Sequence, residues 1–368
     1  MQIDRLILTN FKNYERESFR FSPRFNCLVG RNGMGKTNLL DAVYYLCMGK
    51  SYFVNNDSHI SLHGSDFFRL EGHFRRETKT EKIVAKVLPR KKKELERNGV
   101  AYARLSEHVG LLPVVIIIPD DTLLATEGSE ERRRFLDNTI SQLDAVYLRH
   151  LIQYQKVLRQ RNAALKTMAE SGRFQGTLLE VYDQQLLEPS RYIHEKRAAF
   201  VTDFSPLLAQ TYQLISDKAE TVSCRYRSPL EKEPDLLELL REAREKDRIL
   251  QRTTTGLHRD DLLFYLDGYP LKRFASQGQL KSYILALKLA QYEVIKQHTK
   301  QPPLLLLDDI FDKLDHHRVH QLISLLQEGE YGQIFITDTD EKRVSQILES
   351  GDSIYSEFLI SQGKATAL

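Results

Sequence analysis

The sequence predicts an α/β fold into which a mostly helical domain is inserted. Strand-like and helical segments alternate up to residue 118 and again after residue 251, whereas the pattern between them is mostly helical. A glycine-rich turn, VGRNGMGKTNLL, also joins an apolar stretch to a helical one near the N-terminus. We therefore expect one α/β domain built from residues 1–118 and 251–368, with residues 119–250 inserted as a helical arm.

The composition is that of a globular protein. Hydrophobic residues make up 41% of the 368 residues, and 53 Lys and Arg against 50 Asp and Glu leave a net charge of +3. This balance neither requires nor excludes a polyanionic partner, so a nucleic-acid site depends on local clusters of charge. Cys27, Cys47 and Cys224 are too scattered for a disulfide framework or a zinc site, which fits a reducing compartment.

No segment of the sequence predicts a membrane span or a signal peptide. The longest apolar run, Leu111–Ile118, is far shorter than the roughly 20 residues that a span needs. The N-terminal MQIDRLILTNF carries charges within its apolar stretch and lacks a small-residue cleavage site. We expect a soluble, cytoplasmic protein with no membrane partner.

The N-terminal part of the chain is expected to be rich in strands. Residues 3–29 alternate apolar and polar side chains in two runs that lead into the glycine turn. Apolar residues from Leu39 to Cys47 recur at helical spacing, and Gly49 closes that helix. Residues 67–88 again indicate strands, Asn98-Gly99 indicates a hairpin turn, and 111–118 indicate a buried strand.

Strand signals return after the helical segment. Residues 261–274 predict strands that turn at Asp267-Gly268, and a helix is expected over 279–297. The buried strand LLLLDD, another helix and the strand QIFITD follow. The C-terminal pattern is therefore again α/β.

Residues Gly30–Thr37 fit the phosphate-loop pattern G-x-x-x-x-G-K-[ST] in full. Glycines let backbone N–H groups approach phosphate oxygens, and the dipole of the following helix adds positive potential. Lys36 can reach the β- and γ-phosphates, and the Thr37 hydroxyl can ligate Mg²⁺. A chance match at a tight turn is the alternative, which the strand before and the helix after the loop disfavour. We predict an ATP site that includes Gly30, Arg31, Asn32, Gly33, Met34, Gly35, Lys36, Thr37 and Asn38.

The run LLLLDD, from Leu304 to Asp309, is typical of a buried parallel strand that ends at a ligand site. Asp308 would hold Mg²⁺ opposite Thr37. Asp309 would orient or deprotonate the attacking water. The alternative is a core strand that ends in two solvated acids, and the phosphate loop elsewhere in the chain favours the metal site.

Ser276, Gln277 and Gly278 begin a predicted helix. A serine with free N–H groups at a helix start can bind an anion, although the same pattern is equally consistent with a helix N-cap alone. Because the chain already holds one phosphate loop, a second such site suggests the nucleotide of a neighbouring copy.

The order of these motifs, together with Asp312-Lys313-Leu314-Asp315, resembles that of ABC-type ATPases: Walker A, signature, Walker B and D-loop. More narrowly, the chain resembles the RecF family of bacterial recombination mediators. Further matching stretches cover nearly the whole chain: LTNFKNYE, PDDTLLATEGSEERRRFLD, QRNAALK, TTTGLHRDDL, FASQGQLKS and LLLLDDIFDKLD.

The chain departs from the family at Leu257, where Pro is usual, and at Leu280-Lys281, where Gln-Arg is usual. Neither a Q-loop glutamine nor a switch histidine is assigned, because the relevant strand ends in Thr337-Asp338-Thr339.

The resemblance implies an ABC-type P-loop ATPase head with a mixed sheet and an inserted helical arm. It also implies ATP-driven homodimerisation in which Ser276, Gln277 and Gly278 of a second copy close over the γ-phosphate. The dimer would clamp gapped DNA or double-strand/single-strand junctions and, with RecR and RecO, promote RecA loading in repair, replication restart and the SOS response. Asp309 is shorter than the glutamate common in ABC enzymes, so we expect slow hydrolysis that serves as a switch, with Lys36 and Asp309 as its catalytic residues.

Three basic clusters are candidates for DNA contact. Arg90–Lys93 with Arg97 lie near a predicted hairpin tip, and Arg132–Arg134 open the helical insert. The predicted helix 147–166 places an apolar stripe on one side and cations largely elsewhere; the stripe is Leu148, Leu151, Ile152 and Leu158, and the cations are Arg149, Lys156, Arg159 and Arg161. For each cluster alone, a solvated surface is the favoured explanation, and any DNA contact would be mainly to phosphates.

Two further interpretations stay open at this point. His258-Arg259-Asp260-Asp261 could be an acid/base set, but a structural hydrogen-bond node is the favoured explanation. A monomeric P-loop kinase or metabolic ATPase with a helical lid is the main alternative function, which the Ser276 helix start disfavours. A transporter subunit and a long coiled-coil chromosome organiser fit less well, because the insert is long and charged but shows no sustained heptads.

Overall fold

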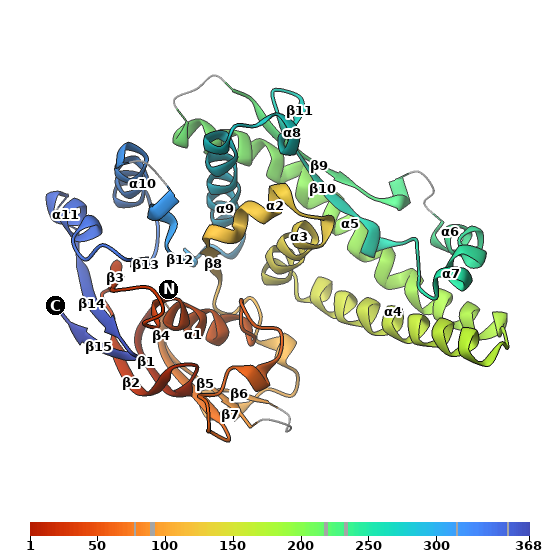
Figure 1. Ribbon diagram of the computed structural model, residues 1–368, viewed down its shortest axis with the longest axis horizontal. Helices are drawn as coiled ribbons and strands as arrows, with labels where there is room; N and C mark the ends of the chain where they lie inside the picture. Colours follow the sequence, from red (N-terminus) through yellow and green to blue (C-terminus); the bar gives the residue numbers. More distant parts are fainter. Residues whose placement is uncertain (77–78, 89–92, 217–219, 232–234, 314–315, 352) are drawn as a thin grey trace. The chain divides into compact units, whose positions relative to one another are not determined.

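The computed structural model describes residues 1–76, 79–88, 93–216, 220–231, 235–313, 316–351 and 353–368 (Figure 1). The chain forms two compact units, one of residues 1–121 with 288–368 and one of residues 122–287. The first unit breaks after residue 121, and the expected domain breaks after residue 118. Residues 251–287, which were expected in the α/β domain, instead group with the helical unit, because their strands pair with a strand of that unit.

The first unit contains an antiparallel sheet with the strand order β2-β1-β4-β5-β6-β7. The alternation expected over residues 3–29 corresponds to three strands, of which two pair here and the third belongs to another sheet. The predicted turn at Asn98-Gly99 joins the last two strands. The strands are β1 (Gln2–Phe11), β2 (Tyr14–Arg20), β4 (Phe68–Arg76), β5 (Lys79–Val87), β6 (Glu94–Arg97) and β7 (Val100–Ala101).

A second sheet of the same unit, ordered β15-β14-β3-β13-β12-β8, carries the phosphate loop. Neighbouring strands from β14 to β8 are parallel, and β15 is antiparallel at the edge. Its inner strands are buried along their whole length, as expected for a parallel sheet that is covered on both faces. The strands are β3 (Phe25–Val29), β8 (Val114–Ile117), β12 (Leu304–Leu307), β13 (Ile334–Asp338), β14 (Tyr355–Ser361) and β15 (Lys364–Ala367).

Helix α1 (Lys36–Met48) contacts strands of both sheets, including β4 and β8. Nearly all of its residues are buried, including the charged Lys36 and Asp41, so the helix is buried on every side rather than along one stripe. The helix ends at Gly49, whose left-handed conformation closes it as the sequence predicts. One continuous core joins α1 to the two sheets and fixes the direction in which α1 leaves the glycine loop.

The second unit is built on a long antiparallel pair of helices, α4 and α5, which run side by side in Figure 1. A three-stranded sheet ordered β11-β10-β9 packs on α5. The elements are α2 (Leu123–Thr126), α3 (Ser129–Leu143), α4 (Ala145–Ser171), α5 (Gly176–Ile215), β9 (Val222–Arg227), α6 (Leu236–Glu242), α7 (Arg244–Leu250), β10 (Asp261–Leu266), β11 (Tyr269–Pro270) and α8 (Leu271–Phe274). Strand β9 is absent from the sequence prediction.

The expected stripe on α4 is only partly correct. Leu151 is buried, but Ile152 is 48% exposed. Arg161, expected off the apolar stripe, is fully buried on the packed face and forms ion pairs with Asp183 and Asp247, both at 2.7 Å. A charged residue occupies this apolar face because two carboxylates from other helices compensate its charge.

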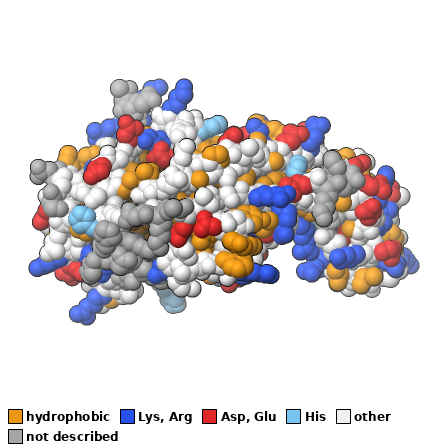
Figure 2. All heavy atoms as spheres, turned by 90° about the horizontal axis from the view of Figure 1, so that it is seen from above, with side chains coloured by type: hydrophobic (Ala, Val, Ile, Leu, Met, Phe, Trp, Pro, Cys, Tyr) orange, Lys and Arg blue, Asp and Glu red, His pale blue; other side chains and the backbone are white. Residues whose placement is uncertain are grey.

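The remaining helices are α9 (Gln277–Thr299), α10 (His316–Glu328) and α11 (Arg343–Ser350), and short 3-10 turns occur at residues 57–59, 105–107, 119–122, 229–231, 257–259 and 310–313. The helix predicted over 279–297 is thus confirmed as α9. Among the described residues, no helix is both long and apolar enough to cross a bilayer. On the face seen in Figure 2, charged side chains of both signs are interspersed with hydrophobic ones.

Candidate functional site

The glycine loop follows β3 and precedes α1, as the sequence predicts. Gly30, Gly33 and Gly35 have φ values of 136°, 78° and 119°, which residues with a side chain rarely adopt. Gly35 is the N-cap of α1, and no side chain of the described residues caps this end of the helix. The N–H groups of the first turn therefore face the loop without a side-chain partner, where they can bind an anion.

Lys36 lies inside the loop rather than in solvent. Only 4% of this residue is exposed. Its ammonium donates hydrogen bonds to the carbonyl oxygens of Gly30 (2.6 Å) and Arg31 (3.2 Å). The ammonium thus sits against the curve of the loop, which is the position from which it can neutralise a bound phosphate.

Thr37 and Asp308 meet at the carboxyl ends of β3 and β12. The Thr37 hydroxyl lies 2.9 Å and 3.0 Å from the two carboxylate oxygens of Asp308. Burial raises the pKa of Asp308, while hydrogen bonds from Thr337 and Thr37 act in the opposite direction. A hydroxyl and a desolvated carboxylate side by side are oxygen ligands suited to Mg²⁺.

Thr337, at the end of β13, links the two aspartates of LLLLDD. Its hydroxyl donates to Asp308 (2.8 Å) and accepts a hydrogen bond from the backbone N–H of Asp309 (2.8 Å). Asp309 adopts a left-handed backbone with φ of 46°. In the sequence, Thr337 stands out only as part of the strand end that lacks a switch histidine. Its position at the end of a parallel strand beside β12 is the signal that could have identified it.

The phosphate loop is held from behind by the β1–β2 turn. The Asn13 amide donates to the Met34 carbonyl (2.9 Å) and accepts a hydrogen bond from the side chain of Asn38 (2.7 Å). The Tyr14 hydroxyl donates to the Gly35 carbonyl (2.9 Å). In a trans peptide the C=O and N–H point in opposite directions. Anchoring these two carbonyls therefore turns the N–H groups of Gly35 and Lys36 toward the opposite side, which is the phosphate side.

The C-terminal turn between β14 and β15 supports the same part of the loop. The N–H of Gly363 donates to the Met34 carbonyl (3.0 Å). A Cβ on Gly363 would lie 2.1 Å from the backbone oxygen of Asn13, so only glycine permits this close approach. Two turns at opposite ends of the chain thus fix the backbone of Met34 and Gly35.

Ser276 lies in the other compact unit, at the start of α9. Its N–H donates to the Gln279 side chain (2.7 Å), and the N–H of Gln279 donates back to the Ser276 hydroxyl (3.2 Å). This reciprocal pair is a capping box. Ser276 and Gln277 are exposed and Gly278 is half-buried. The N-cap interpretation is therefore confirmed, and a role toward a second nucleotide stays a prediction.

The expected D-loop cannot be placed in full. Leu314 and Asp315 lie outside the described residues, as do the side chains of Asp312 and Lys313. The structure therefore brings Lys36, Thr37, Asp308 and Asp309 together in one unit, without testing the D-loop.

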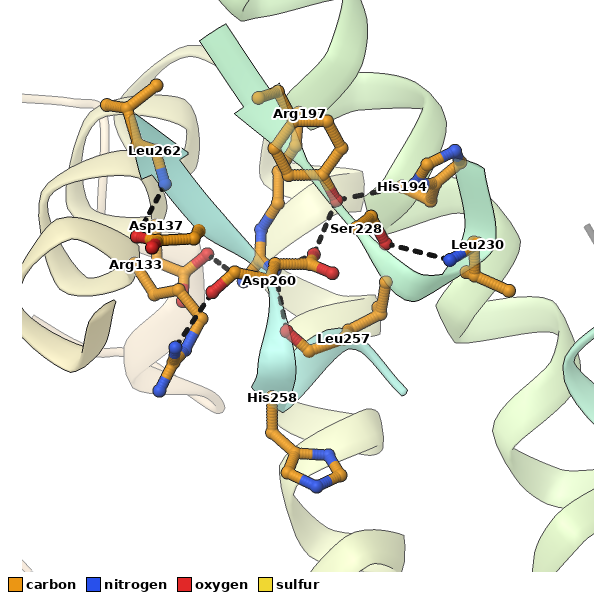
Figure 3. Close-up of polar contacts among 12 residues, drawn as sticks. Arg133, Asp137, His194, Arg197, Ser228, Leu230, Leu257, His258, Asp260 and Leu262 are labelled. Atoms are coloured by element: carbon orange, nitrogen blue, oxygen red, sulfur yellow. Dashed lines mark hydrogen bonds and ion pairs between the residues drawn. The ribbon is translucent and has the colours of Figure 1, made fainter. Parts of the chain in front are cut away.

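The HRDD stretch, expected as a structural node, is built into a buried polar network (Figure 3). The ring nitrogens of His258 lie 3.0 Å from the Tyr154 hydroxyl and 2.9 Å from the Thr253 carbonyl. Burial lowers the pKa of His258 to about 4. In Figure 3 its side chain points away from Asp260, which pairs with Arg197 at 2.6 Å. His258 is thus neutral at physiological pH and fully engaged, as expected of a structural residue.

Arg197 is the centre of this network. Its guanidinium also contacts Asp137 at 2.7 Å and the Leu257 carbonyl at 3.2 Å. Burial alone would lower the pKa of Arg197, but the carboxylates of Asp137 and Asp260 raise it well above its ordinary value. The network ties α5 to the segments around residues 137 and 260 within the second unit. It therefore serves packing of that unit.

Comparison with known proteins places this geometry in a family. The family model for the RecF/RecN/SMC N terminal domain matches residues 2–363. The DNA replication and repair protein RecF of Flavobacterium johnsoniae is 46% identical over 358 residues, which cover 97% of this chain and 99% of that protein. That of Bacteroides thetaiotaomicron is 42% identical over 364 residues, 99% of this chain and 98% of the relative.

Two solved structures of the recombination mediator protein RecF in the RecFOR pathway, RecF-ATPrS and RecF-ATP, superpose with TM-scores of 0.90 and 0.89. Each is 28% identical, and the matches cover all of this chain and 98% and 97% of the solved chains. The SmcHead bound to the C-winged helix domain of ScpA matches with a TM-score of 0.56 at 16% identity, which shows a shared fold only. The fold is that of an ABC-type ATPase head.

Proposed function

Because the chain belongs to the RecF family, we propose that it is an ATP-dependent DNA-binding protein of DNA replication and repair. The observation that carries this proposal is the site formed by Lys36, Thr37 and Asp308. A buried lysine against a glycine loop, with a hydroxyl and a carboxylate beside it, suits a nucleoside triphosphate and a divalent cation.

The residues of the site would divide the work of binding. Backbone N–H groups of the loop from Gly30 to Asn38 would surround the phosphates, and Lys36 would neutralise the β- and γ-phosphate charge. Thr37 and Asp308 would give up their mutual hydrogen bond and offer both oxygens to Mg²⁺. ATP would supply the phosphoanhydride bond that is hydrolysed.

Asp309 would orient the attacking water. Its backbone N–H is fixed by Thr337, whose hydroxyl also holds Asp308, so one side chain would align the acid for the metal with the acid for the water. A carboxylate in this position can accept a proton from water as the γ-phosphate is attacked. Because aspartate has a shorter reach than glutamate, we expect slow turnover.

The proposal includes a homodimer that ATP holds together. Ser276, Gln277 and Gly278 of a second copy would close over the γ-phosphate. The capping box supports this role because it fixes the start of α9 at a position where Ser276 and Gln277 are exposed. The Ser276 hydroxyl accepts one hydrogen bond there, so its proton can be donated to an anion. Hydrolysis would remove the shared γ-phosphate and let the copies separate.

In the cell, the closed dimer would clamp gapped DNA or double-strand/single-strand junctions. By its family, the protein would work with RecR and RecO in the cytoplasm to promote RecA loading in gap repair, replication restart and the SOS response. We propose RecR and RecO as partners because of the family, and no surface of this chain is assigned to them.

Sedimentation and DNA binding test the proposal together. Wild-type protein should be monomeric with ADP or without nucleotide and dimeric with ATP and Mg²⁺, and it should bind gapped duplex best in the dimeric state. Lys36→Ala should weaken ATP binding at least about tenfold, because a buried charged contact is lost, and should abolish both effects. Lys79→Ala, which removes an exposed lysine of β5, is the control. A protein that stays monomeric with bound ATP would instead support the kinase alternative.

A further inference from the structure

The structure separates the three basic clusters that the sequence offers as DNA contacts. Arg90, Lys91 and Lys92 lie outside the described residues, and Lys93 pairs with Asp57 at 2.9 Å. The nearby Arg97 is bound to Glu81, with its Nε 2.9 Å from a carboxylate oxygen. The described part of this cluster is therefore neutralised by acids of its own unit.

The arginines at the start of α3 are engaged within their own unit as well. Arg132 pairs with Asp261 at 2.7 Å, and Arg134 pairs with Glu131 at 3.2 Å. Arg133 donates to the Ser129 hydroxyl (2.5 Å) and to the Asp260 carbonyl (2.8 Å). Two of the three arginines are thus paired with acids, and the third donates to polar groups of the second unit.

Helix α4 differs from both clusters. Arg149, Lys156, Arg159 and Lys166 are all exposed, and no ion pair joins any of them to a carboxylate within the described ranges. The 27 residues of α4 include a single acid, Glu170, at the far end of the helix. The neighbouring α5 exposes side chains of both signs: the acids Glu180, Glu188, Glu195 and Asp203 and the cations Arg191 and Lys196. Among the three basic clusters, α4 thus carries the longest row of exposed cations that no described ion pair neutralises.

The four cations share one face of α4. At 3.6 residues per turn, Arg149 and Lys156 are about 20° apart, Arg159 and Lys166 are about 20° apart, and all four fall within about 100°. The opposite face of α4, with Tyr154 and Leu165, is buried. From Arg149 to Lys166 the face extends about 25 Å at 1.5 Å per residue. That length matches about seven phosphates of one strand at ~3.4 Å each.

We propose that the exposed face of α4, defined by Arg149, Lys156, Arg159 and Lys166, binds the phosphate backbone of DNA. This inference rests on the proposed function and names a surface for it. A row of unpaired cations complements a polyanion, and long flexible side chains at this spacing can follow phosphates without reading bases. The surface would therefore add affinity with little sequence preference.

The test is DNA binding by fluorescence anisotropy, with ATP and Mg²⁺, on labelled gapped duplex over a series of salt concentrations. The α4 variant carries Arg149→Gln, Lys156→Gln, Arg159→Gln and Lys166→Gln. The control carries Arg134→Gln, Lys196→Gln, Arg241→Gln and Arg248→Gln, which remove four cations of the same unit that are 44–64% exposed but paired with acids. Both variants lose the same net charge. Melting temperature and ATP affinity establish that each is folded.

The α4 variant should bind DNA at least tenfold more weakly at low salt. Its log–log salt slope should fall by up to about 3.6, since each phosphate contact contributes about 0.9. Lys156→Gln alone should lower the slope by about 0.9, and the control should stay within twofold of wild type. Equal losses in the α4 and control variants, or an unchanged α4 variant, would overturn the inference. Either of those results assumes that the wild-type protein binds DNA. If the wild-type protein does not bind DNA, the proposed function is wrong, and the inference about α4 is wrong with it.

Discussion

At the scale of single residues, the arrangement of the acids depends on Thr337. One hydroxyl donates to the carboxylate of Asp308 and accepts from the N–H of Asp309. The left-handed backbone of Asp309 is unusual for a residue with a side chain, and a hydrogen bond at its N–H helps to hold it. Thr337 is thus a positioning residue for both the proposed metal ligand and the proposed water-orienting acid.

We expect Thr337→Val to slow ATP hydrolysis by about tenfold to a hundredfold, because it removes hydrogen bonds that involve a charged group while keeping the side-chain shape. Steady-state phosphate release measures the effect. Thr337→Ser keeps the hydroxyl and should have most of the wild-type rate of hydrolysis. If Thr337 served packing alone, Thr337→Val would keep the wild-type rate and Thr337→Ser would lose it. Wild-type kinetics in Thr337→Val would show that the hydroxyl does not position the acids.

The residues of the site differ in how far the sequence reveals them. Lys36 and Thr37 lie in a pattern whose spacing follows from the geometry of a phosphate loop, so they could be assigned without a structure. Thr337 carries no pattern, because its partners come from a neighbouring strand and only strand pairing brings them together. The sequence could not reveal the buried position of Arg161 for the same reason, because its partner Asp247 is remote in the chain and only the fold brings the two together.

At the scale of elements, the phosphate loop is held between two turns. The β1–β2 turn supplies Asn13, and the β14–β15 turn supplies Gly363, and both bond to the Met34 carbonyl. This arrangement gives the LTNFKNYE stretch a physical role, because Asn13 in this stretch orients the backbone of the phosphate loop. The loop geometry therefore depends on segments from both ends of the chain.

Removing either support should weaken nucleotide binding. We expect Asn13→Ala to raise the Kd for ATP about tenfold, because it removes hydrogen bonds to Met34 and Asn38 worth about 1 kcal/mol each. Gly363→Ala should also weaken binding, since its Cβ would lie 2.1 Å from the Asn13 backbone oxygen and must displace that turn. Titration of a fluorescent ATP analogue measures both.

Gly99→Ala is the matched control for Gly363→Ala. Gly99 lies in the same unit with a similar φ of 82°, but a Cβ there would contact nothing within 4 Å. Asn55→Ala, at an exposed position, controls for Asn13. Both controls should bind ATP as wild type does. If Gly99→Ala weakened binding as much as Gly363→Ala, general backbone strain and not contact with the loop would be responsible.

The elements themselves were predicted where periodicity is strong. Helix α9, the LLLLDD strand and the hairpin at Asn98-Gly99 agree with the sequence analysis. Strand β9 was missed because it follows the 40-residue helix α5 and because its pairing partner, β10, lies beyond two short helices, α6 and α7. Residues 271–274 form a short helix instead of continuing a strand, since Pro270 lacks the N–H that a continued ladder needs.

At the scale of the whole molecule, the two proposed halves of the nucleotide site lie in different compact units. The phosphate loop and LLLLDD lie in the unit of residues 1–121 and 288–368, and the Ser276 helix start lies in the unit of residues 122–287. Sequence patterns placed this start in the α/β domain because strands precede it. The pairing of β10 with β9 groups it with the helical unit instead.

Asp309→Asn should separate dimerisation from hydrolysis. The amide keeps the size of the side chain and the hydrogen bond at the Asp309 N–H, but it cannot accept a proton from water. Hydrolysis should fall about a hundredfold or more, as for loss of a general base. ATP binding should be retained, because the loop and the Thr37–Asp308 pair are unchanged. Wild-type dimers should revert to monomers as ATP is consumed, whereas Asp309→Asn dimers should persist through the same time course in analytical ultracentrifugation.

Asp120→Asn, at an exposed position after the neighbouring strand β8, is the control and should behave as wild type. Undiminished hydrolysis in Asp309→Asn would rule out the assigned role of this acid. Lost hydrolysis without a dimer would leave the acid in its role but would reject ATP as the link between two copies. These two outcomes can be distinguished because phosphate release measures hydrolysis at one site, whereas sedimentation measures the association of two copies. The single variant Asp309→Asn therefore tests both the hydrolysis step and the dimerisation step of the proposed switch.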